Sequence, residues 1–579
     1  MLRKYVSLLL LLGGGMLHAQ NIPEHIAYTQ VYGFLDELAT DGVVDLSSHV
    51  KPYSRKLIAA KLQEALLKDS LLSARQYVDL KFYLNDYSNE LDTLPKSFVH
   101  WTNHQTFDLS LLEPSFHYRD NYFKCRIAPL LGMDLTYNRK GLLIKRWYGA
   151  DIQLDIVGHV SVWGSIRDQS YNGKYLKDSY FDSNLAKING AKLAQSQYLN
   201  NLPGCEYKEA SYGGDFSDVR AGISIYDWWG SIGLVKDNVV WGDSYRSSNV
   251  LSGRAPSFPM VTLSLTPCKW FSFQYFHGWL NSNVADSTRY YVEESYTDST
   301  SRIHYRPKNK FMAANLFTFT PIKNLNLSIG NSIVYAEDNV QAAYFIPFAF
   351  YKSLDHLMTK GLKVENQNSQ AFLMVSSRNI PHLHLYGSVF VDEFSLRRWK
   401  KDNPERNIVS YQAGANVTNW PLKNLSYGFE YTRSNILCYK HSIEAITWES
   451  NSYLLGHYLG ANSQEFYAHV TYKPIRSLSI RLSYVHADKG TDYPYVRRST
   501  TQALSQPVLG NIIWKHDEAS VRVTYEIWNN LYAVVDLGYN HDRAYDDDYG
   551  TAETYLNRYT PVYLHGENFT TTAGMAFGF

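Results

Sequence analysis

The chain has 579 residues, a net charge of +1 and a mean hydropathy of −0.33. The balanced charge gives no reason to expect binding to nucleic acid or to an anionic membrane surface, and the hydropathy excludes a bundle of membrane helices. Aromatic residues make up 15% of the chain, with 47 tyrosines, a high share for a soluble enzyme. Many tyrosines in a chain that is not hydrophobic overall are typical of a membrane β-barrel, which has aromatic girdles and strands with one apolar and one polar face.

Residues 1–19 are typical of a secretory signal peptide. Two basic residues precede an apolar run from Val6 to Leu12, and Ala19 precedes the expected cleavage site. The run is too short to span a bilayer. No cysteine follows the cleavage site, so we expect no lipoprotein anchor, and no later run of about 18 apolar residues predicts a helical span. We expect a secreted protein that ends in the outer membrane.

Residues 20–93 predict a small α-helical bundle. Apolar residues recur at helical spacing over Pro23–Ala39, Ser54 can cap a second helix, and Ser73–Leu91 supplies a third. This segment is too small to be the main body of the protein. We expect it to be an appendage on the periplasmic side of the membrane or a plug, followed by a linker over residues 94–120.

From residue 121 to residue 579 the hydrophobic period changes to two, which is the period of β-strands. One face of a strand near the end of the chain carries Leu478, Ile480, Leu482 and Tyr484, and the other carries serine and arginine. The sequence predicts about 18 strands: 121–137, 143–156, 160–168, 214–226, 230–240, 257–266, 270–280, 311–320, 324–336, 368–378, 382–393, 407–419, 424–433, 464–473, 477–487, 517–527, 531–540 and 566–579. Most are near the 9–11 residues that a tilted membrane strand needs.

The connections between these strands alternate between short turns and long loops. Several short turns begin with proline, as in Pro267-Cys268-Lys269-Trp270-Phe271, because proline cannot lie in a central strand. The long loops are 169–213, 241–256, 281–310, 337–367, 434–463 and 488–516, with 138–142 the one brief member of that set. Short turns on one side and long loops on the other are typical of outer-membrane barrels. The last strand alternates and ends on an aromatic residue, Phe579, which agrees with that fold.

A soluble β-sandwich or propeller is the alternative fold. Sandwich strands are commonly shorter, and a propeller would show a repeat of about 40–50 residues. Neither explains the asymmetry of the loops. We therefore expect a mainly β protein: a transmembrane antiparallel β-barrel of about 18 strands with a small N-terminal α-helical bundle.

The sequence contains no catalytic signature, such as a nucleophile elbow, a zinc-protease motif or a phosphate loop. A His-Ser-Asn site, as in an outer-membrane phospholipase, would be built from residues far apart in the chain, so the sequence leaves it open. Four cysteines lie far apart without metal or redox spacing, and we expect no disulfide: Cys125, Cys205, Cys268 and Cys438. We expect no enzyme and no cofactor.

Three polar clusters each have two interpretations. His382 and His384 could share a metal ion, Asp546-Asp547-Asp548 could hold calcium, and Arg397-Arg398-Trp399-Lys400-Lys401 could attract an acidic polymer. The alternatives are a lumen-facing pair for the histidines and solvated external loops for the other two. We favour these alternatives and expect no metal site.

The loop 241–256 is the most informative candidate site. Trp241, Tyr245, Arg246 and Arg254 combine flat amphipathic rings with planar guanidinium donors. Such rings suit the C–H faces of sugars, and guanidinium groups suit carboxylates such as those of uronic acids. The alternative is that the aromatic rings belong to the membrane interface and Arg254 pairs with a carboxylate on the barrel wall. Spacing alone favours this alternative.

The run from Trp241-Gly242 to Leu251–Met260 resembles the capsule assembly Wzi family, in its Bacteroidetes-type branch. The matching features are the Trp-Gly pair and a Leu-Ser-Gly-Arg-Ala-Pro-Ser-Phe-Pro run before a strand. Tyr32–Leu66 also looks like the helical N-terminus of that branch. The resemblance implies an 18-stranded outer-membrane barrel with a helical bundle at its periplasmic end, acting as a surface lectin that holds capsular polysaccharide. Gly253 stands where an asparagine is expected.

The sequence thus supports a non-enzymatic barrel that binds and anchors capsular or surface polysaccharide through Trp241, Tyr245, Arg246 and Arg254. Its expected partners are that polysaccharide and outer-membrane lipid, but not nucleic acid. The alternative functions are an outer-membrane channel or a component of gliding-motility or secretion machinery with export or motility partners, because gliding-motility barrels look similar.

Overall fold

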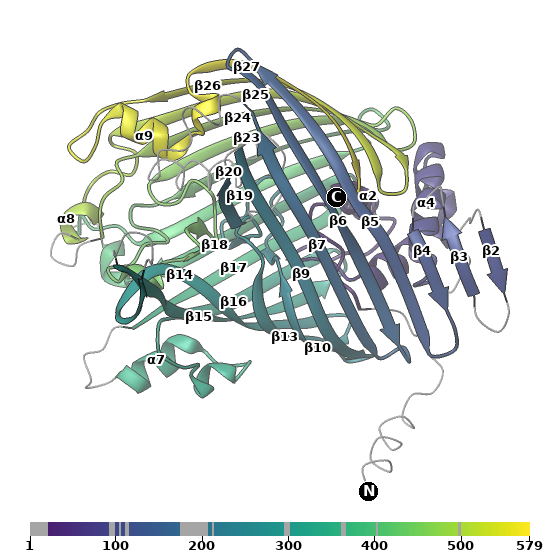
Figure 1. Ribbon diagram of the computed structural model, residues 1–579, viewed down its shortest axis with the longest axis horizontal. Coiled ribbons are helices and arrows are strands. Elements are labelled where there is room, and N and C mark those ends of the chain that lie inside the picture. Colours follow the sequence, from purple (N-terminus) through teal and green to yellow (C-terminus); the bar gives the residue numbers. More distant parts are fainter. Residues whose placement is uncertain are drawn as a thin grey trace, which may run out of the picture.

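The computed structural model describes residues 21–91, 99–102, 106–110, 115–173, 206–210, 213–294, 301–359, 366–400, 403–495 and 500–578. The predicted signal peptide and Phe579 lie outside these ranges. Figure 1 shows a broad barrel of tilted strands. The helices α2 (Thr29–Thr40) and α4 (Ala74–Asp86) lie at one end, and α8 (Thr500–Leu504) and α9 (Ala552–Tyr559) lie at the other.

Within the described ranges, eighteen antiparallel strands form a closed ring. Each pairs with the next along the ring, and the last pairs with the first to close it. The ring strands are β5 (Phe123–Asn138), β6 (Gly141–Ile156), β7 (Val160–Asn172), β9 (Gly213–Asp227), β10 (Gly230–Asp237), β13 (Phe258–Cys268), β14 (Phe271–Glu294), β15 (Ser301–Ile322), β16 (Leu325–Tyr335), β17 (Gln367–Ile380), β18 (Leu383–Glu393), β19 (Ile408–Thr418), β20 (Leu425–Ser434), β23 (Ser463–Tyr472), β24 (Leu478–Gly490), β25 (Ile512–Trp528), β26 (Leu531–Ala544) and β27 (Glu567–Phe577). Each predicted strand is present, and the predicted fold class is confirmed.

One predicted long loop is mostly strand. β14 and β15 have 24 and 22 residues, so they continue through most of 281–310. Their hairpin extends beyond the ring because cross-strand aromatic pairs such as Tyr290 with Tyr305 continue the ladder. The two strands are therefore longer than a membrane-spanning strand needs to be.

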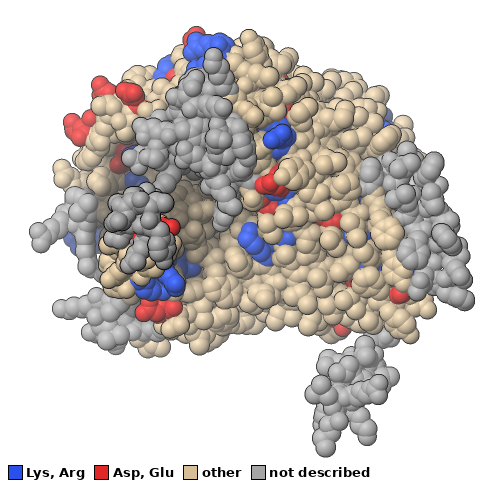
Figure 2. Space-filling model, in the orientation of Figure 1, with Lys and Arg blue, Asp and Glu red and all other residues tan. Residues whose placement is uncertain are grey.

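The two faces of the strands differ as the sequence predicts. On β24, Leu482 and Tyr484 are exposed on the outer wall, whereas Ser479, Arg481 and Ser483 line the lumen. Figure 2 shows few Lys, Arg, Asp or Glu side chains on the outer wall of the barrel in view. An apolar outer wall with a polar lumen is what a membrane barrel requires.

The N-terminal segment folds into helices α2, α3 (Arg55–Leu66) and α4, with the one-turn helix η1 (Asp69–Leu71) and the short strand β1 (Val50–Lys51). Ser54 and Ser73 cap α3 and α4, as predicted. α2 begins at Thr29 rather than Pro23, because Pro23 forms a β-bridge with Ser54. None of the helices in the described ranges is long and apolar enough to span a membrane.

The helices close the end of the barrel that carries the short turns. Glu37 of α2 accepts a hydrogen bond from Lys473 at 2.9 Å, and Asp79 of α4 accepts one from the Ser477 N–H at 3.0 Å. Both partners lie in the turn between β23 and β24. Arg75 of α4 donates to Asn424 in the turn before β20 at 2.9 Å. These contacts place the bundle over the short-turn end of the lumen.

The predicted linker 94–120 contains three strands instead: β2 (Val99–Thr102), β3 (Thr106–Ser110) and β4 (Ser115–Arg119). β4 pairs with the first half of β5, and the second half of β5 pairs with β27. The segment therefore extends the sheet at the point where the ring closes. A strand beside β5 satisfies backbone groups that would otherwise form an open edge.

Two predicted external loops fold into the lumen. Residues 238–257 form β11 (Val240–Trp241) and β12 (Leu251–Ser252), and β11 also pairs with β1. Residues 435–462 form η4 (Glu444–Ile446), β21 (Glu449–Ser450) and β22 (Tyr453–Leu454). Both segments join an apolar core with lumen-facing residues such as Phe372 and Met374. The lumen-facing side chains of these strands are apolar, and the two loops cover them and so remove them from water.

The remaining elements are β8 (Glu206–Ala210), η2 (Ala342–Phe345), α7 (Tyr351–Thr359), η3 (Leu396–Trp399) and η5 (Val562–Leu564). Cys125, Cys268 and Cys438 are free thiols. Cys205 lies outside the described residues, so the expectation of no disulfide stays a prediction for that residue.

Candidate functional site

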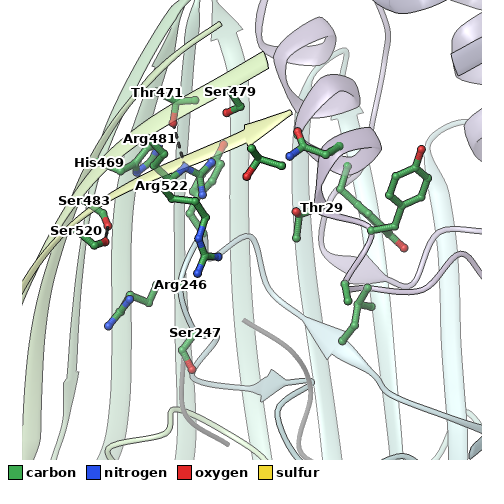
Figure 3. Close-up of a pocket in the computed structure, with 18 of the residues that line it drawn as sticks. Thr29, Arg246, Ser247, His469, Thr471, Ser479, Arg481, Ser483, Ser520 and Arg522 are labelled. Carbon is green, nitrogen blue, oxygen red and sulfur yellow. Dashed lines mark hydrogen bonds between the residues drawn. The ribbon is translucent and has the colours of Figure 1, made fainter. Parts of the chain in front are cut away.

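A cavity of about 490 Å³ lies in the lumen between α2, the loop 238–257 and the barrel wall. The wall residues come mainly from β23 to β27, on the side of the ring opposite the apolar core. Figure 3 shows Arg246, Arg481 and Arg522 along one side of the cavity, with Thr29 of α2 across from them. The predicted loop and the helical bundle thus meet at one polar chamber.

Trp241 lies behind this chamber. Its side chain is 2% exposed and packs edge-on against Phe276 and at a tilt against Phe372. The interpretation of Trp241 as a sugar-stacking residue does not fit this placement, because other rings cover it. The indole instead anchors the loop to the apolar wall of the lumen.

Tyr245 lines the cavity and is held from two sides. Its hydroxyl donates to Asp36 of α2 at 2.5 Å and lies 3.0 Å from Nδ1 of His384, while its backbone N–H donates to Glu430 at 3.0 Å. Burial, together with the nearby negative charge of Asp36, raises the pKa of Tyr245. The phenol therefore stays neutral and fixes the loop against α2 and the wall.

Arg246 is buried beside two wall carboxylates. Its guanidinium lies 3.4 Å from Glu465 and 3.4 Å from Glu518, with its centre 5.4 Å from the middle of the Tyr467 ring. Burial disfavours the charged form, but the surrounding Tyr458 and carboxylates raise the pKa of Arg246 well above its ordinary value. Arg246 is therefore a fixed cation at the edge of the cavity.

Arg254 supports Arg246 from within the same loop. Its Nη2 donates to the carbonyl of Arg246 at 2.9 Å, and its guanidinium lies 4.9 Å from the centre of the Tyr458 ring. The predicted pairing of Arg254 with a wall carboxylate stays a prediction. Tyr245, Arg246 and Arg254 thus line one cavity, and Trp241 anchors their loop.

The wall contributes functional residues that the sequence did not single out as a site. Arg481 projects from β24 and donates a hydrogen bond from Nε to the Thr471 hydroxyl at 3.0 Å. Arg522 is paired with Asp536 at 2.7 Å. The hydroxyls of Ser483 and Ser520 lie 2.8 Å apart. The alternation of β24 predicted its polar face from the sequence. The sequence did not predict which residues of the neighbouring strands lie beside that face.

This arrangement can hold a molecule rich in hydroxyl or carboxylate groups. Guanidinium groups donate in planar pairs to carboxylates, and serine and threonine hydroxyls both donate and accept. Arg481 is a cation in the cavity that has no carboxylate partner among the described residues. The chamber therefore offers the Arg481 guanidinium for an anionic group and several hydroxyls for a polyol.

Residues 216–554 match the family model described as capsule assembly protein Wzi, which is more than half of the chain. The chain belongs to the Wzi capsule assembly protein family. The resemblance to this family is therefore confirmed, whereas the branch within it stays a prediction. No curated protein sequence matches the chain.

Solved structures are similar to this Wzi-family chain. The structure described as Wzi, an outer membrane protein involved in group 1 capsule assembly in Escherichia coli and a carbohydrate binding β-barrel, aligns with a TM-score of 0.54 at 11% identity, over 96% of this chain and 99% of that chain. OccD3 (OpdP) of Pseudomonas aeruginosa aligns with a TM-score of 0.41 at 10% identity, over 78% of this chain and 91% of that chain. The Wzi-family chain shares the β-barrel fold of the Escherichia coli protein.

Two serine–histidine pairs in this Wzi-family barrel bear on the phospholipase alternative. Ser376 lies 2.9 Å from Nε2 of His384, whose Nδ1 is 3.8 Å from Asp36, and Ser328 lies 2.5 Å from Nδ1 of His49. The serines and histidines are almost completely buried. His49 belongs to the N-terminal segment, and His384 lies next to Asp36 of α2. Both pairs are therefore enclosed between the barrel wall and the N-terminal segment, and neither serine faces a lipid or a polymer.

The predicted polar clusters serve structural roles in the Wzi-family barrel. His382 lies in the turn before β18 and is 3.0 Å from Asp41, whereas His384 points to other partners in the lumen. Asp547 accepts the hydroxyl of Tyr555 at 2.5 Å, and Arg398 pairs with carboxylates of its own loop. In the described ranges no group of three or more His, Cys, Asp or Glu side chains is placed to hold a metal ion.

Proposed function

We propose that this protein binds carbohydrate in the outer membrane and acts in capsule assembly without catalysing a reaction. The observation that carries the proposal is the polar cavity of about 490 Å³, lined by arginines and hydroxyls, in a barrel of the Wzi family. The solved Escherichia coli Wzi, described as carbohydrate binding, supports it through the shared fold. The function is to hold capsular or surface polysaccharide at the cell surface.

The four predicted residues and Arg481 have distinct roles in this proposal. Arg246 and Arg481 contact the polymer, because both guanidinium groups line the cavity. Tyr245 and Arg254 set the shape of the loop, and Trp241 anchors it. An acidic sugar is the favoured ligand because Arg481 has no carboxylate partner among the described residues. Arg254→Ala should weaken binding to an acidic polysaccharide by releasing the Arg246 carbonyl.

A cavity-filling variant and a matched control test whether the cavity is the binding site. Ser520→Trp places a large ring in the lumen, whereas Leu482→Trp places the same ring on the exposed outer wall. Binding of acidic and neutral polysaccharides to the detergent-purified barrel would be measured by titration calorimetry. We expect Ser520→Trp to abolish binding and Leu482→Trp to leave it unchanged. Equal binding by both variants would place the site elsewhere.

We further propose export by the signal peptide, with cleavage near Ala19, and membership of the Bacteroidetes-type branch. The helical segment 20–93 then faces the periplasm and the long loops face outward, as in other outer-membrane barrels. Mass spectrometry of the protein isolated from outer membranes should give a mature chain that begins at Gln20. A chain that retains residues 1–19 would contradict this topology.

A further inference from the structure

The connection between β16 and β17 runs along the outside of the barrel. It leaves β16 at Tyr335, passes through η2 and α7, and returns to β17 at Gln367. Figure 1 shows α7 outside the ring of strands, and this helix lies against β16 and β17. Tyr344 and Tyr351 of this connection are completely buried. We call residues 341–359 the lateral segment.

Aromatic contacts fix the lateral segment to the outer wall. Phe348 stacks on Phe273 of β14 with ring centres 4.4 Å apart, and Phe345 stacks on His277 of the same strand at 4.3 Å. These two strand residues face outward, because the intervening Phe276 packs in the lumen. Phe273 is only two residues from the start of β14 at the short-turn end. The segment therefore descends from the long-loop rim across much of the membrane-facing wall.

The wall beneath the lateral segment carries polar side chains where lipid would be expected. The amide of Asn315 donates to the carbonyl oxygens of Pro347 and Ala349 at 2.8 and 2.9 Å. Asn331 donates to Asn315 at 2.7 Å and accepts from the Tyr351 N–H at 2.9 Å. An unpaired polar group in hydrocarbon is costly, and irregular backbone needs partners there. The two wall asparagines and the backbone of the lateral segment thus provide each other's hydrogen-bond partners.

The opposite surface of the lateral segment is apolar and exposed. Phe350 is 55% exposed and Leu357 is 73% exposed, and Ile346 is exposed as well. This surface continues into exposed apolar residues of the adjacent strands, such as Ile329 of β16 and Leu373 of β17. The charged and titratable side chains Lys352, Asp355 and His356 lie on α7, on the part that leads back toward the rim. There their polar ends can reach the headgroups.

We propose that the lateral segment is embedded in the membrane, where acyl chains of the leaflet on the long-loop side cover its exposed face. Asn315 and Asn331 hold it against the wall. The partner is lipid, because the exposed face is continuous with the apolar band of the barrel. The segment takes the place of lipid over β14 to β16 and shields the asparagine pair from hydrocarbon. This proposal does not depend on carbohydrate binding.

Spin-label accessibility in liposomes tests the proposal. In full-length protein with Cys205→Ser and Cys268→Ser, a nitroxide is attached at Phe350→Cys or, as a second position, at Leu357→Cys. Ile329→Cys on the outer wall is the lipid reference, and Asp338→Cys, whose native side chain is 88% exposed, is the water reference. We expect collisions with oxygen to exceed those with a nickel chelate, as at Ile329. Nickel accessibility like that at Asp338, or protection from both reagents by a protein partner, would overturn the proposal.

The asparagine pair is tested with the same label. In Asn315→Ala/Asn331→Ala, the label at Phe350→Cys should gain mobility and lose its oxygen preference, because the backbone of the segment has lost its partners. Heat-modifiable migration in electrophoresis checks that the barrel is still folded. An unchanged spectrum in a folded barrel would show that the pair does not hold the segment.

Discussion

Arg481 is the residue on which recognition of an acidic ligand depends most in our account. It projects into the cavity beside Thr471, and it has no carboxylate to neutralise it among the described residues. Arg246, by contrast, already lies between two wall carboxylates. A ligand carboxylate therefore gains more from Arg481, since a charge-assisted hydrogen bond contributes about 1.5–3 kcal/mol.

We predict that Arg481→Ala lowers the affinity for an acidic polysaccharide by about tenfold or more, which corresponds to about 1.4 kcal/mol or more. Arg481→Lys should restore part of this loss because it keeps the charge but not the planar fork. Arg146→Ala, which removes an exposed arginine from the outer wall, is the control. Titration of the purified barrel measures all three. Equal losses for Arg481→Ala and Arg146→Ala would contradict a specific role in the cavity.

Glu37 makes the attachment of the helices dependent on pH. Burial alone would raise its pKa, but Lys473 and Arg75 outweigh burial and lower the pKa from 4.5 to about 2. The ionised carboxylate therefore stabilises the folded state above about pH 4.5, by on the order of 3 kcal/mol. This stabilisation is lost as the pH falls from about 4.5 toward 2.

We predict that protease cleavage of the N-terminal helices accelerates as the pH is lowered through this window. Glu37→Gln should be cleaved faster at neutral pH and should respond less to acid. Glu567→Gln, at an exposed position far from the helices, is the control. An acid-stable protease that acts in this range reports the cleavage. The same pH response in Glu37→Gln and wild type would assign the effect to other groups.

At the scale of elements, the inward loop 238–257 connects the helices to the cavity. β11 pairs with β1 of the N-terminal segment on one side and with β12 on the other. Trp241 holds this small sheet on the apolar wall, and Tyr245 and Arg246 follow it into the cavity. The position of the binding residues therefore depends on the packing of one indole ring.

We predict that Trp241→Ala loosens the loop at a cost of about 3–5 kcal/mol, because the lost ring leaves a void among Phe276 and Phe372. The barrel itself should stay folded, since its hydrogen-bonded ring does not include this residue. Limited proteolysis should cleave within 238–257, and polysaccharide binding should weaken. Trp420→Ala, at an exposed turn, is the matched control. A protease-resistant loop would show that Trp241 is not its anchor.

The sequence was sufficient for the strands and insufficient for the loops, for a physical reason. Strand alternation is local, so residues such as Ser479, Arg481 and Ser483 show their face directly. The inward fold of 238–257 depends on Trp241 meeting Phe276 and other lumen residues far along the chain. The polar residues of that loop favoured an external position, and only the apolar lumen wall explains its actual one.

The candidate site was predictable to a similar extent. The loop sequence placed Tyr245, Arg246 and Arg254 together because they are close in the chain. Arg481 and Ser520 could not be assigned to the same chamber, because the closure of the ring and the position of α2 decide which wall remains uncovered. The lateral segment was expected as an ordinary long loop, since its partners Asn315 and Asn331 lie on other strands.

We expect the helical bundle and the inward loops to restrict passage through the barrel. We predict low ion conductance for the wild-type protein in planar bilayers and a clear increase when residues 21–91 are deleted. If that variant does not fold, Asp36→Asn/Glu37→Gln weakens the same attachment and should give brief openings. High steady conductance in the wild type would favour the channel alternative instead.

At the scale of the whole molecule, the barrel combines an apolar outer wall, a lumen that contains inward-folded loops and a polar chamber. The apolar wall suits a membrane, and a polar cavity for a ligand lies between the helices, the inward loops and the wall. This combination suits retention of a polymer better than its transport. Capsule assembly, gliding motility and secretion differ in what is lost when the barrel is removed.

The most direct test is to delete the gene and compare polysaccharide on the cells with polysaccharide released into the medium. The proposed function predicts that polymer moves into the medium while its total amount stays constant, and that the wild-type gene but not the Ser520→Trp variant restores attachment. An unchanged cell-bound fraction would contradict the central claim that this barrel holds polysaccharide at the surface.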